Sequence, residues 1–257
     1  GEEHAFVAGL ARREIPVVAA LDLNGRTLNP HAGFRFAVYP RRGGRTPELE
    51  DPATLEWMGR FIGRIHAAGA TRPFVHRPGL DIESFGVEPR DWLLEHGFIP
   101  ADLRPAWTSA VEHALAGVRR CHDRAGGVRT LRLHGDCHAG NVLWSETGEG
   151  KGSPGSSPGG PHFVDFDDSR TGPAIQDLWM LLSGDRAAMT KQLSDVLAGY
   201  EDFADFDRRE LALVEALLSR AAFSEAEQEV ERIAPDTPDG ALAARSRLFA
   251  TVADPVH

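Results

Sequence analysis

The stretch that decides the fold is a polar segment, His134-Gly135-Asp136-Cys137-His138-Ala139-Gly140-Asn141, with an apolar stretch directly after it at 142–144. A second segment, Phe163-Val164-Asp165-Phe166-Asp167-Asp168, follows a run rich in Gly, Ser and Pro at 147–161. We predict short strands at 142–144 and 163–166, joined by that flexible run. A hairpin of this kind would bring Asp165 back beside Asn141.

These polar groups are the ones that phosphoryl transfer uses. One carboxylate must orient the attacking hydroxyl and accept its proton, while an amide and a second carboxylate hold Mg²⁺ against the nucleotide phosphates. Asp136 and Asn141 are five residues apart, with a glycine before each. Oxygen ligands such as those of Asn141 and Asp165 favour Mg²⁺ over zinc. The two segments are therefore a candidate site for magnesium-dependent phosphoryl transfer.

Two other patterns suggest different chemistry. His134, Cys137 and His138 are potential zinc ligands, so a metal-dependent hydrolase is an alternative function class. Residues 148–153 imitate a phosphate-binding loop, but no Ser or Thr directly follows Lys151 and no long helix is predicted after it. We interpret 148–153 as a linker.

Composition excludes some classes of protein. The net charge of −10 argues against broad nucleic-acid binding, which needs a positive surface. No apolar run approaches the roughly 20 residues of a membrane-spanning helix, so we expect no membrane association. The 257 residues include two cysteines without a CxxC spacing, which indicates a reducing, cytoplasmic setting.

Local patterns predict the remaining elements. Asn24-Gly25 is a strong turn signal, and Asp51-Pro52 combines an N-cap acid with a proline at the first helical position. From about Ser224 the sequence is charged and irregular, and we predict no fold there. We expect helices at 2–14, from 51, at 101–121, 177–182, 191–200 and 208–220, and strands at 17–23, 34–39 and 130–133.

Two longer strings, LRLHGDCHAGNVLW (131–144) and FVDFDDSRTGPAIQDLWMLLSGD (163–185), identify a family. They resemble the aminoglycoside-phosphotransferase and protein-kinase-like superfamily, and within it the bacterial protein serine/threonine kinases. The resemblance extends from about Glu2 to about Leu218. It implies an α+β, protein-kinase-like fold and an ATP-dependent kinase with Mg²⁺ as cofactor.

The resemblance also implies residue roles. Asp136 matches the catalytic base, Asn141 a Mg²⁺ ligand, and Asp165 the Mg²⁺-binding catalytic acid. Asp177 matches the acid that braces the catalytic loop from the following helix. Glu3 matches the glutamate that pairs with the ATP-phosphate lysine, Ala37, Val38, Tyr39 and Pro40 the hinge beside adenine, and His138 a group near nucleotide or substrate.

The resemblance further implies a domain division. We expect a partial N-lobe at 1–45, a helical C-lobe at 46–222 and a divergent tail at 223–257. The family places a Gly-rich strand pair and a lysine strand before the helix at residue 2, so we expect a fragment whose beginning is missing. Neither Lys151 nor Lys191 is positioned to replace that lysine.

Three functions stay open within this resemblance. The first is a monomeric kinase that takes ATP and a protein serine or threonine. The second is a small-molecule kinase acting on an amino alcohol, homoserine or an aminoglycoside. The third is a catalytically impaired, pseudokinase-like chain, which the missing lysine would explain.

Overall fold

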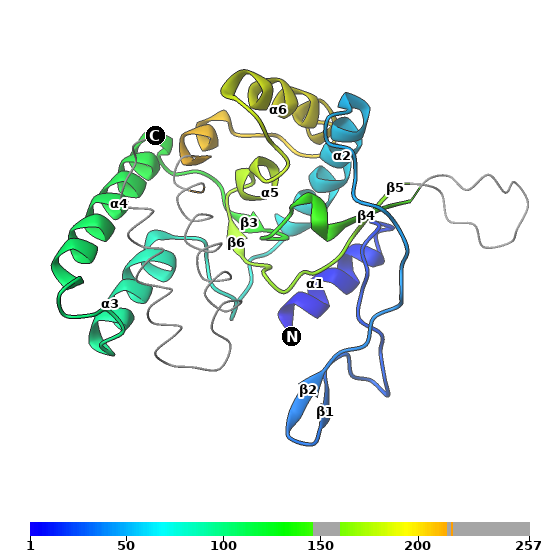
Figure 1. Cartoon of the computed structure of the whole chain (residues 1–257). Helices are drawn as coiled ribbons and strands as arrows, with labels where there is room; N and C mark the ends of the chain where they lie inside the picture. Colours follow the sequence, from blue (N-terminus) through cyan, green and yellow to red (C-terminus); the bar gives the residue numbers. More distant parts are fainter. Residues whose placement is uncertain (146–159, 215–216, 218–257) are drawn as a thin grey trace, which may run out of the picture. The chain divides into compact units, whose positions relative to one another are not determined.

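The computed structural model describes residues 1–145, 160–214 and 217 (Figure 1). They divide into two compact units. The first contains residues 1–79 and 129–208, and the second contains residues 80–128 and the described residues from 209 on. The predicted division at 45/46 and 222/223 stays a prediction, and residues 223–257 lie outside the described chain. None of the described helices is long and apolar enough to cross a membrane.

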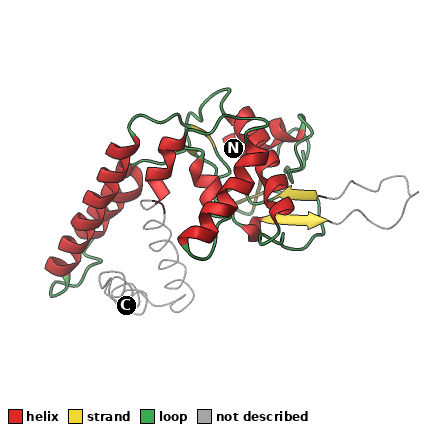
Figure 2. Cartoon of the chain, turned by 90° about the horizontal axis from the view of Figure 1, so that it is seen from above, coloured by secondary structure: helices red, strands yellow, loops and turns green. Residues whose placement is uncertain are grey.

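The first unit combines helices with short antiparallel strand pairs (Figure 2). Its helices are α1 (Glu2–Ala11), α2 (Pro52–Gly69), the 3-10 turn η2 (Ala139–Asn141), α5 (Ile175–Trp179) and α6 (Arg186–Tyr200). Its strands pair as β1 (Asn29–His31) with β2 (Phe34–Phe36), β3 (Leu131–Arg132) with β6 (Thr171–Gly172), and β4 (Val142–Ser145) with β5 (Gly160–Phe163). The predicted α+β class is thus confirmed.

Helix α1 is shorter than the predicted 2–14. It ends at Ala11, and the chain then turns through Glu14, which has a left-handed φ of 57°. The amide of Ile15 donates to the carbonyl of Leu10, which folds the buried Ile15 back under the helix. The last turn of the periodic pattern is therefore a reversal of the chain and not helix.

The predicted strand at 17–23 is wrong. This segment is extended, but it makes only isolated bridges, from Val17 to Phe163 and from Leu23 to Arg26. The second bridge closes the predicted Asn24-Gly25 turn, whose φ values are 57° and 82°. The strand predicted at 34–39 shortens to β2, and its hairpin partner is β1.

Helix α2 begins as its sequence predicts. Asp51 accepts hydrogen bonds from the amides of Ala53 and Thr54, and Pro52 is the first helical residue. Buried apolar side chains recur along one face of the helix: Leu55, Met58, Ile62 and Ile65. This face anchors the core of the first unit.

Helices α2 and α6 pack closely because glycines line their contact, and Figure 1 shows the two helices side by side. A Cβ atom on Gly59 would collide with the carbonyl of Val196, and one on Gly199 would collide with the carbonyl of Glu56. A Cβ on Gly63 would lie 2.7 Å from the carbonyl oxygen of Tyr200. The backbones therefore approach to a distance that a larger residue would not permit.

The second unit is helical in its described part. It contains the π-helical turn η1 (Glu83–Val87), α3 (Glu88–Glu95) and α4 (Arg104–Ala125); the 3-10 helix η3 (Arg208–Leu213) begins at the last residue of the first unit. Its core consists of Ile99, Trp107, Val111 and Leu115. Helix α4 replaces the predicted 101–121, and η3 is the described part of the predicted 208–220 helix.

Candidate active site

The predicted catalytic loop connects β3 to η2 and β4. The side-chain amide of Asn141 donates to Asp136 twice, to the backbone carbonyl at 2.9 Å and to the carboxylate at 3.0 Å. The structure therefore brings together the two residues that were predicted as base and metal ligand. The amide donors of Asn141 face Asp136, which leaves its amide oxygen as the atom that could bind a cation.

Asp177 on α5 holds this loop through hydrogen bonds to its backbone. Its carboxylate accepts the backbone amides of His134 and Gly135, each at 2.8 Å, and a hydrogen bond from His66 at 2.9 Å. Burial alone would raise the pKa of Asp177, but the hydrogen bond and charge of His66, the charge of His134 and the amide of Gly135 together hold the pKa below its ordinary value. This is the bracing contact that the resemblance implied.

Gly135 is required at its position by geometry. Its φ is 94°, and a Cβ atom there would collide with the carbonyl of Asp168. The polar segment at 134–141 and the acidic segment at 163–168 therefore touch through backbone atoms, at a point where only glycine fits.

The β4–β5 hairpin has the predicted arrangement, with Val142 opposite Phe163. The strand predicted at 163–166 ends at Phe163, because Asp165 adopts a left-handed φ of 59°. The amide of Val164 donates to the carbonyl of Asn141 at 3.0 Å, so Asp165 follows directly after the residue bonded to Asn141. Asn141 and Asp165 thus lie on adjoining backbone segments, and an amide oxygen and a carboxylate are ligand types that suit a hard cation such as Mg²⁺.

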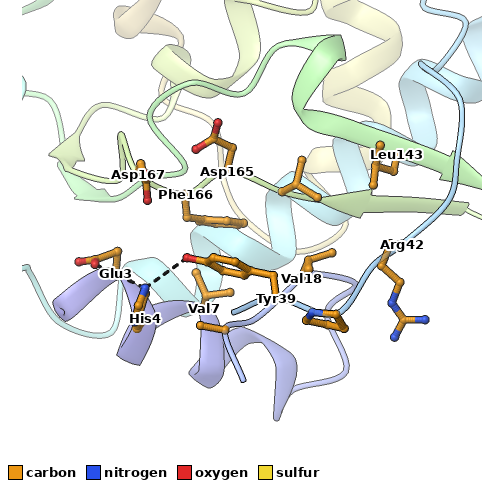
Figure 3. A pocket seen from close by; sticks show the side chains of 13 residues that line it. Glu3, His4, Val7, Val18, Tyr39, Arg42, Leu143, Asp165, Phe166 and Asp167 are labelled. Carbon is orange, nitrogen blue, oxygen red and sulfur yellow. Dashed lines mark hydrogen bonds and ion pairs between the residues drawn. The ribbon is translucent and has the colours of Figure 1, made fainter. Parts of the chain in front are cut away.

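A cavity of about 350 Å³ opens beside Asp165 (Figure 3). Glu3, Asp165 and Asp167 gather on one side of it, while Val18, Leu143 and Arg42 lie on the other. Its remaining lining is mostly apolar: Val7, Ala20, Pro40, Val164 and Phe166. The cavity thus combines an acidic side with apolar walls. Arg42 adds a basic residue to this lining.

The predicted hinge is only partly at this cavity. Tyr39 and Pro40 line it, whereas Ala37 and Val38 do not. The carbonyl of Val38 instead accepts a hydrogen bond from the amide of Leu21. Burial, followed by the nearby carboxylates of Asp167, Glu3 and Asp165, raises the pKa of Tyr39.

His4 is a cavity residue that the sequence did not indicate. Its ring lies 3.2 Å from the hydroxyl of Tyr39 and 2.8 Å from that of Thr27, one at each nitrogen. The dashed line in Figure 3 follows the contact between His4 and Tyr39. Nothing in the local sequence distinguishes His4 from a surface histidine, because Thr27 and Tyr39 are distant along the chain.

The two N-terminal glutamates have different surroundings. Glu3 lines the cavity and pairs with Arg77 at 2.9 Å. Glu2 instead accepts backbone amides from the 75–77 segment. Of the two, Glu3 is therefore the one placed for a role at the cavity. Lys191 pairs with Asp195 at 3.0 Å on the exposed side of α6, and Lys151 lies outside the described residues.

His138 lies next to the loop but outside the cavity lining. Its Nδ1 accepts the amide of Gly140 at 2.9 Å, and its Nε2 lies 3.5 Å from the carboxylate of Asp136. The other two residues of the zinc alternative are His134 and Cys137. His134 donates from Nε2 to the carbonyl of Val164 at 2.8 Å. Burial raises the pKa of the Cys137 thiol well above its ordinary value. Over the described ranges, no three His, Cys, Asp or Glu side chains are grouped to hold a metal ion. The geometry therefore gives the zinc hydrolase alternative no support.

Comparison with known proteins gives consistent matches. Residues 1–214 match the family described as "Phosphotransferase enzyme family". Stress response kinase A of Escherichia coli (strain K12) is 43% identical over 216 residues, which are 84% of this chain and 61% of that protein. The serine/threonine protein kinase RdoA of Salmonella typhimurium (strain LT2) is 42% identical over the same shares. The chain thus spans about three fifths of the length of these relatives.

Solved structures show the same fold. An amicoumacin kinase in complex with AMP-PNP and Ca²⁺ matches with a TM-score of 0.68 and 19% identity, over 98% of this chain and 76% of that one. A microcompartment-associated aminopropanol kinase matches with a TM-score of 0.66 and 18% identity, over 98% and 78%. Together with the match over residues 1–214, these similarities show that the chain has the protein-kinase-like fold and belongs to the phosphotransferase enzyme family.

Proposed function

We propose that this chain is the catalytic part of an ATP-dependent protein serine/threonine kinase. The observation that carries the proposal is the placement of three polar residues: Asn141 is hydrogen-bonded to Asp136, and Asp165 directly follows Val164, whose amide donates to Asn141. Asp177 braces the loop of Asp136 and Asn141, which does not line the cavity, whereas Asp165 is one of the residues that line it. Few other protein groups are needed, because phosphoryl transfer depends on positioning and electrostatic stabilisation.

Asp136 is the group placed to handle the acceptor proton. One carboxylate oxygen is held by the side chain of Asn141, so the other can accept the hydrogen bond of an incoming hydroxyl. The acceptor oxygen forms a bond to the γ-phosphorus while the bond from that phosphorus to the bridging oxygen of ADP breaks. The hydroxyl proton passes to Asp136, and ADP leaves with the electron pair of the broken bond.

Asn141 and Asp165 would hold the cation. When bound, Mg²⁺ neutralises the charge that develops on the phosphates. The apolar walls near Val18 and Leu143 suit the adenine base, and the segment of Tyr39 and Pro40 lies beside them. This assignment places the phosphates toward the acidic side of the cavity.

The choice of acceptor rests on the relatives that are 42–43% identical, which are named as stress response or serine/threonine kinases. A small-molecule kinase is the second candidate, because solved structures of the same fold include an aminopropanol kinase. Those structures share under a fifth of their residues with this chain, so the protein acceptor has the stronger support.

The test is transfer of labelled γ-phosphate from ATP with Mg²⁺, to the chain itself and to a generic basic protein. We expect incorporation that Asp136→Asn removes. The matched control is Asp195→Asn, a half-buried carboxylate on α6 that pairs with Lys191 and does not line the cavity, and it should leave transfer unchanged. Asp136→Asn retaining full transfer would overturn the role of Asp136.

Complete inactivity of the wild type would favour the pseudokinase reading for this chain. A fluorescent ATP analogue then distinguishes the cases, because a pseudokinase would bind it without transferring phosphate. The same assay on a chain extended at its N-terminus tests whether the lysine strand that the family resemblance implies is needed for transfer. Recovery of transfer in the longer chain would restore the kinase proposal.

A further inference from the structure

The side chain of Arg77 connects two chain segments that form the acidic side of the cavity, without itself lining the cavity. Its Nη1 donates to the carboxylate of Glu3 at 2.9 Å. Its Nε and Nη2 donate to the backbone carbonyls of Ser169 and Asp167. Glu3 reaches the cavity from α1, and Asp167 reaches it from the loop after β5. One guanidinium group therefore joins the helix to the loop that begins at Asp165.

The backbone of Arg77 is fixed to the same helix. The carboxylate of Glu2 accepts the amides of Val75, His76 and Arg77 at 2.9, 2.8 and 3.0 Å. The hydrogen bond from Val75, followed by that from His76, lowers the pKa of Glu2. The side chain of Arg77 is 22% exposed, so most of it is enclosed. Both ends of the residue are thus held in place.

The loop needs such support because its conformation is strained. Asp165 has a φ of 59°, in the left-handed region that most residues other than glycine avoid. Two carbonyls of the loop, at Asp167 and Ser169, point to Arg77. The planar fork of arginine can donate to two carbonyls and a carboxylate at once, whereas lysine has a single nitrogen. Arginine is therefore the residue type that can make these three hydrogen bonds at once.

The charge of Arg77 is a second reason why an arginine suits this position. Glu3, Asp165 and Asp167 place three carboxylates on one side of the cavity, and like charges repel each other. Arg77 pairs directly with one of them and so reduces that repulsion before any ligand binds. A neutral residue at 77 would leave the acidic side both unsupported and more negative.

We propose that Arg77 is a positioning residue of the phosphotransfer site, which sets the separation between Glu3 and the Asp165–Asp167 loop that takes the metal-bound phosphates. The inference rests on the proposed function, since it assigns the acidic side of the cavity to phosphate and metal. Arg77 acts through the residues that it holds and does not itself contact the ligand.

The experiment has two arms, applied to Arg77→Met and Arg77→Lys. In the first arm, hydrogen exchange of the amides at 164–170 is measured in the free protein. In the second, binding of mant-ATP is titrated with Mg²⁺, and again without it. The matched control is Arg90→Met, because Arg90 has a similarly enclosed side chain, 16% exposed and paired with Glu112, in the other unit.

We expect Arg77→Met to speed exchange at 164–170 and to raise the Mg²⁺ concentration for half-saturation at least tenfold. Binding without Mg²⁺ should change less than twofold, and Arg77→Lys should fall between Met and wild type. A general loss of folding in Arg77→Met would instead weaken mant-ATP binding equally with and without Mg²⁺. In that case the same two measurements on Arg77→Lys test the inference. Unchanged exchange and Mg²⁺ dependence in a folded variant would overturn the inference alone. A wild type that binds no mant-ATP would overturn the proposed function, and the inference with it.

Discussion

The imidazole of His66 lies 2.9 Å from the carboxylate of Asp177, and both side chains are excluded from solvent. An ionised carboxylate only accepts hydrogen bonds, so the hydrogen must be on Nε2 of His66. The other nitrogen, Nδ1, lies 3.0 Å from the hydroxyl of Tyr200 on α6. A buried chain of polar groups therefore runs from α6 through α2 to the catalytic loop.

Replacing Asp177 by Asn should break this chain at its central point. The amide would keep one acceptor oxygen but turn an N–H group toward backbone amides that need an acceptor. A hydrogen bond to a charged group contributes about 1.5–3 kcal/mol, so weakening the buried bonds that Asp177 accepts should lower the free energy of unfolding by about 3 kcal/mol. Urea denaturation measures it, with Asp195→Asn, a half-buried carboxylate paired with the exposed Lys191, as the control. A loss below about 1 kcal/mol would contradict the bracing role, since even one net hydrogen bond contributes that much.

The pH dependence of stability should show the burial of His134. Burial lowers the pKa of His134 below its ordinary value of 6.5. The unfolded chain then binds a proton that the folded protein does not. Unfolding free energy should therefore fall as pH drops below 6.5, by at most about 1.4 kcal/mol per pH unit for this group. The lowered pKa of Asp177 adds its own loss only below its ordinary value of 3.8.

Urea titrations between pH 7 and pH 5 test this window. His134→Gln should flatten the slope there, whereas His113→Gln, at an exposed position on α4, should leave it unchanged. Equal slopes in His134→Gln and wild type would show that His134 is not the group responsible.

The sequence predicted features that local chemistry determines. Asp51 caps α2 because an acid followed by proline favours a helix start wherever it occurs, and Asn24-Gly25 turns because both residues tolerate positive φ. The polar segments around Asp136 and Asp165 indicate phosphoryl transfer through their residue types and through their resemblance to the family's motifs. Each of these features lies within a few residues of its cause.

Features that depend on distant partners were not predicted. Arg77 lies in a segment without pattern, and its partners are Glu3 and carbonyls more than 70 residues away in either direction. His66 looks like a polar interruption of an apolar helix face until Asp177 is placed beside it. The segment at 17–23 has the residues of a strand, but it makes only isolated bridges. Propensity alone does not supply the missing partner strand.

The contact between α2 and α6 gives a prediction about packing. Gly199→Ala should lower the free energy of unfolding by about 2–3 kcal/mol, because the added methyl collides with the backbone of Glu56 and neither helix can move freely. Gly117→Ala is the matched control in α4, where the nearest atom to a new Cβ is the mobile Nη2 of Arg120 at 3.6 Å. That change should stabilise by about 0.5–1 kcal/mol, as glycine is unfavourable inside a helix. Similar effects at both sites would refute the close packing.

Asp165 gives a prediction that separates stability from function. Its left-handed φ of 59° suits glycine and asparagine better than most residues. Asp165→Asn should therefore fold with unchanged stability, and Asp165→Gly should be equally stable or gain up to about 1 kcal/mol by relief of strain. Both variants remove the carboxylate of a residue that lines the cavity, so both should raise the Mg²⁺ requirement of mant-ATP binding at least tenfold.

Thermal unfolding and Mg²⁺-dependent binding, measured on the same samples, test the two halves of this prediction together. The exposed Asp168 provides a control, since Asp168→Asn alters a neighbouring carboxylate that bonds Arg170 and does not line the cavity. It should affect Mg²⁺ dependence much less than Asp165→Asn does. If Asp165→Asn loses stability and Mg²⁺ dependence in parallel with Asp168→Asn, the carboxylate of Asp165 supports the loop and does not bind the metal. If binding fails while stability holds, the strained backbone at 165 exists to present that carboxylate to the cavity.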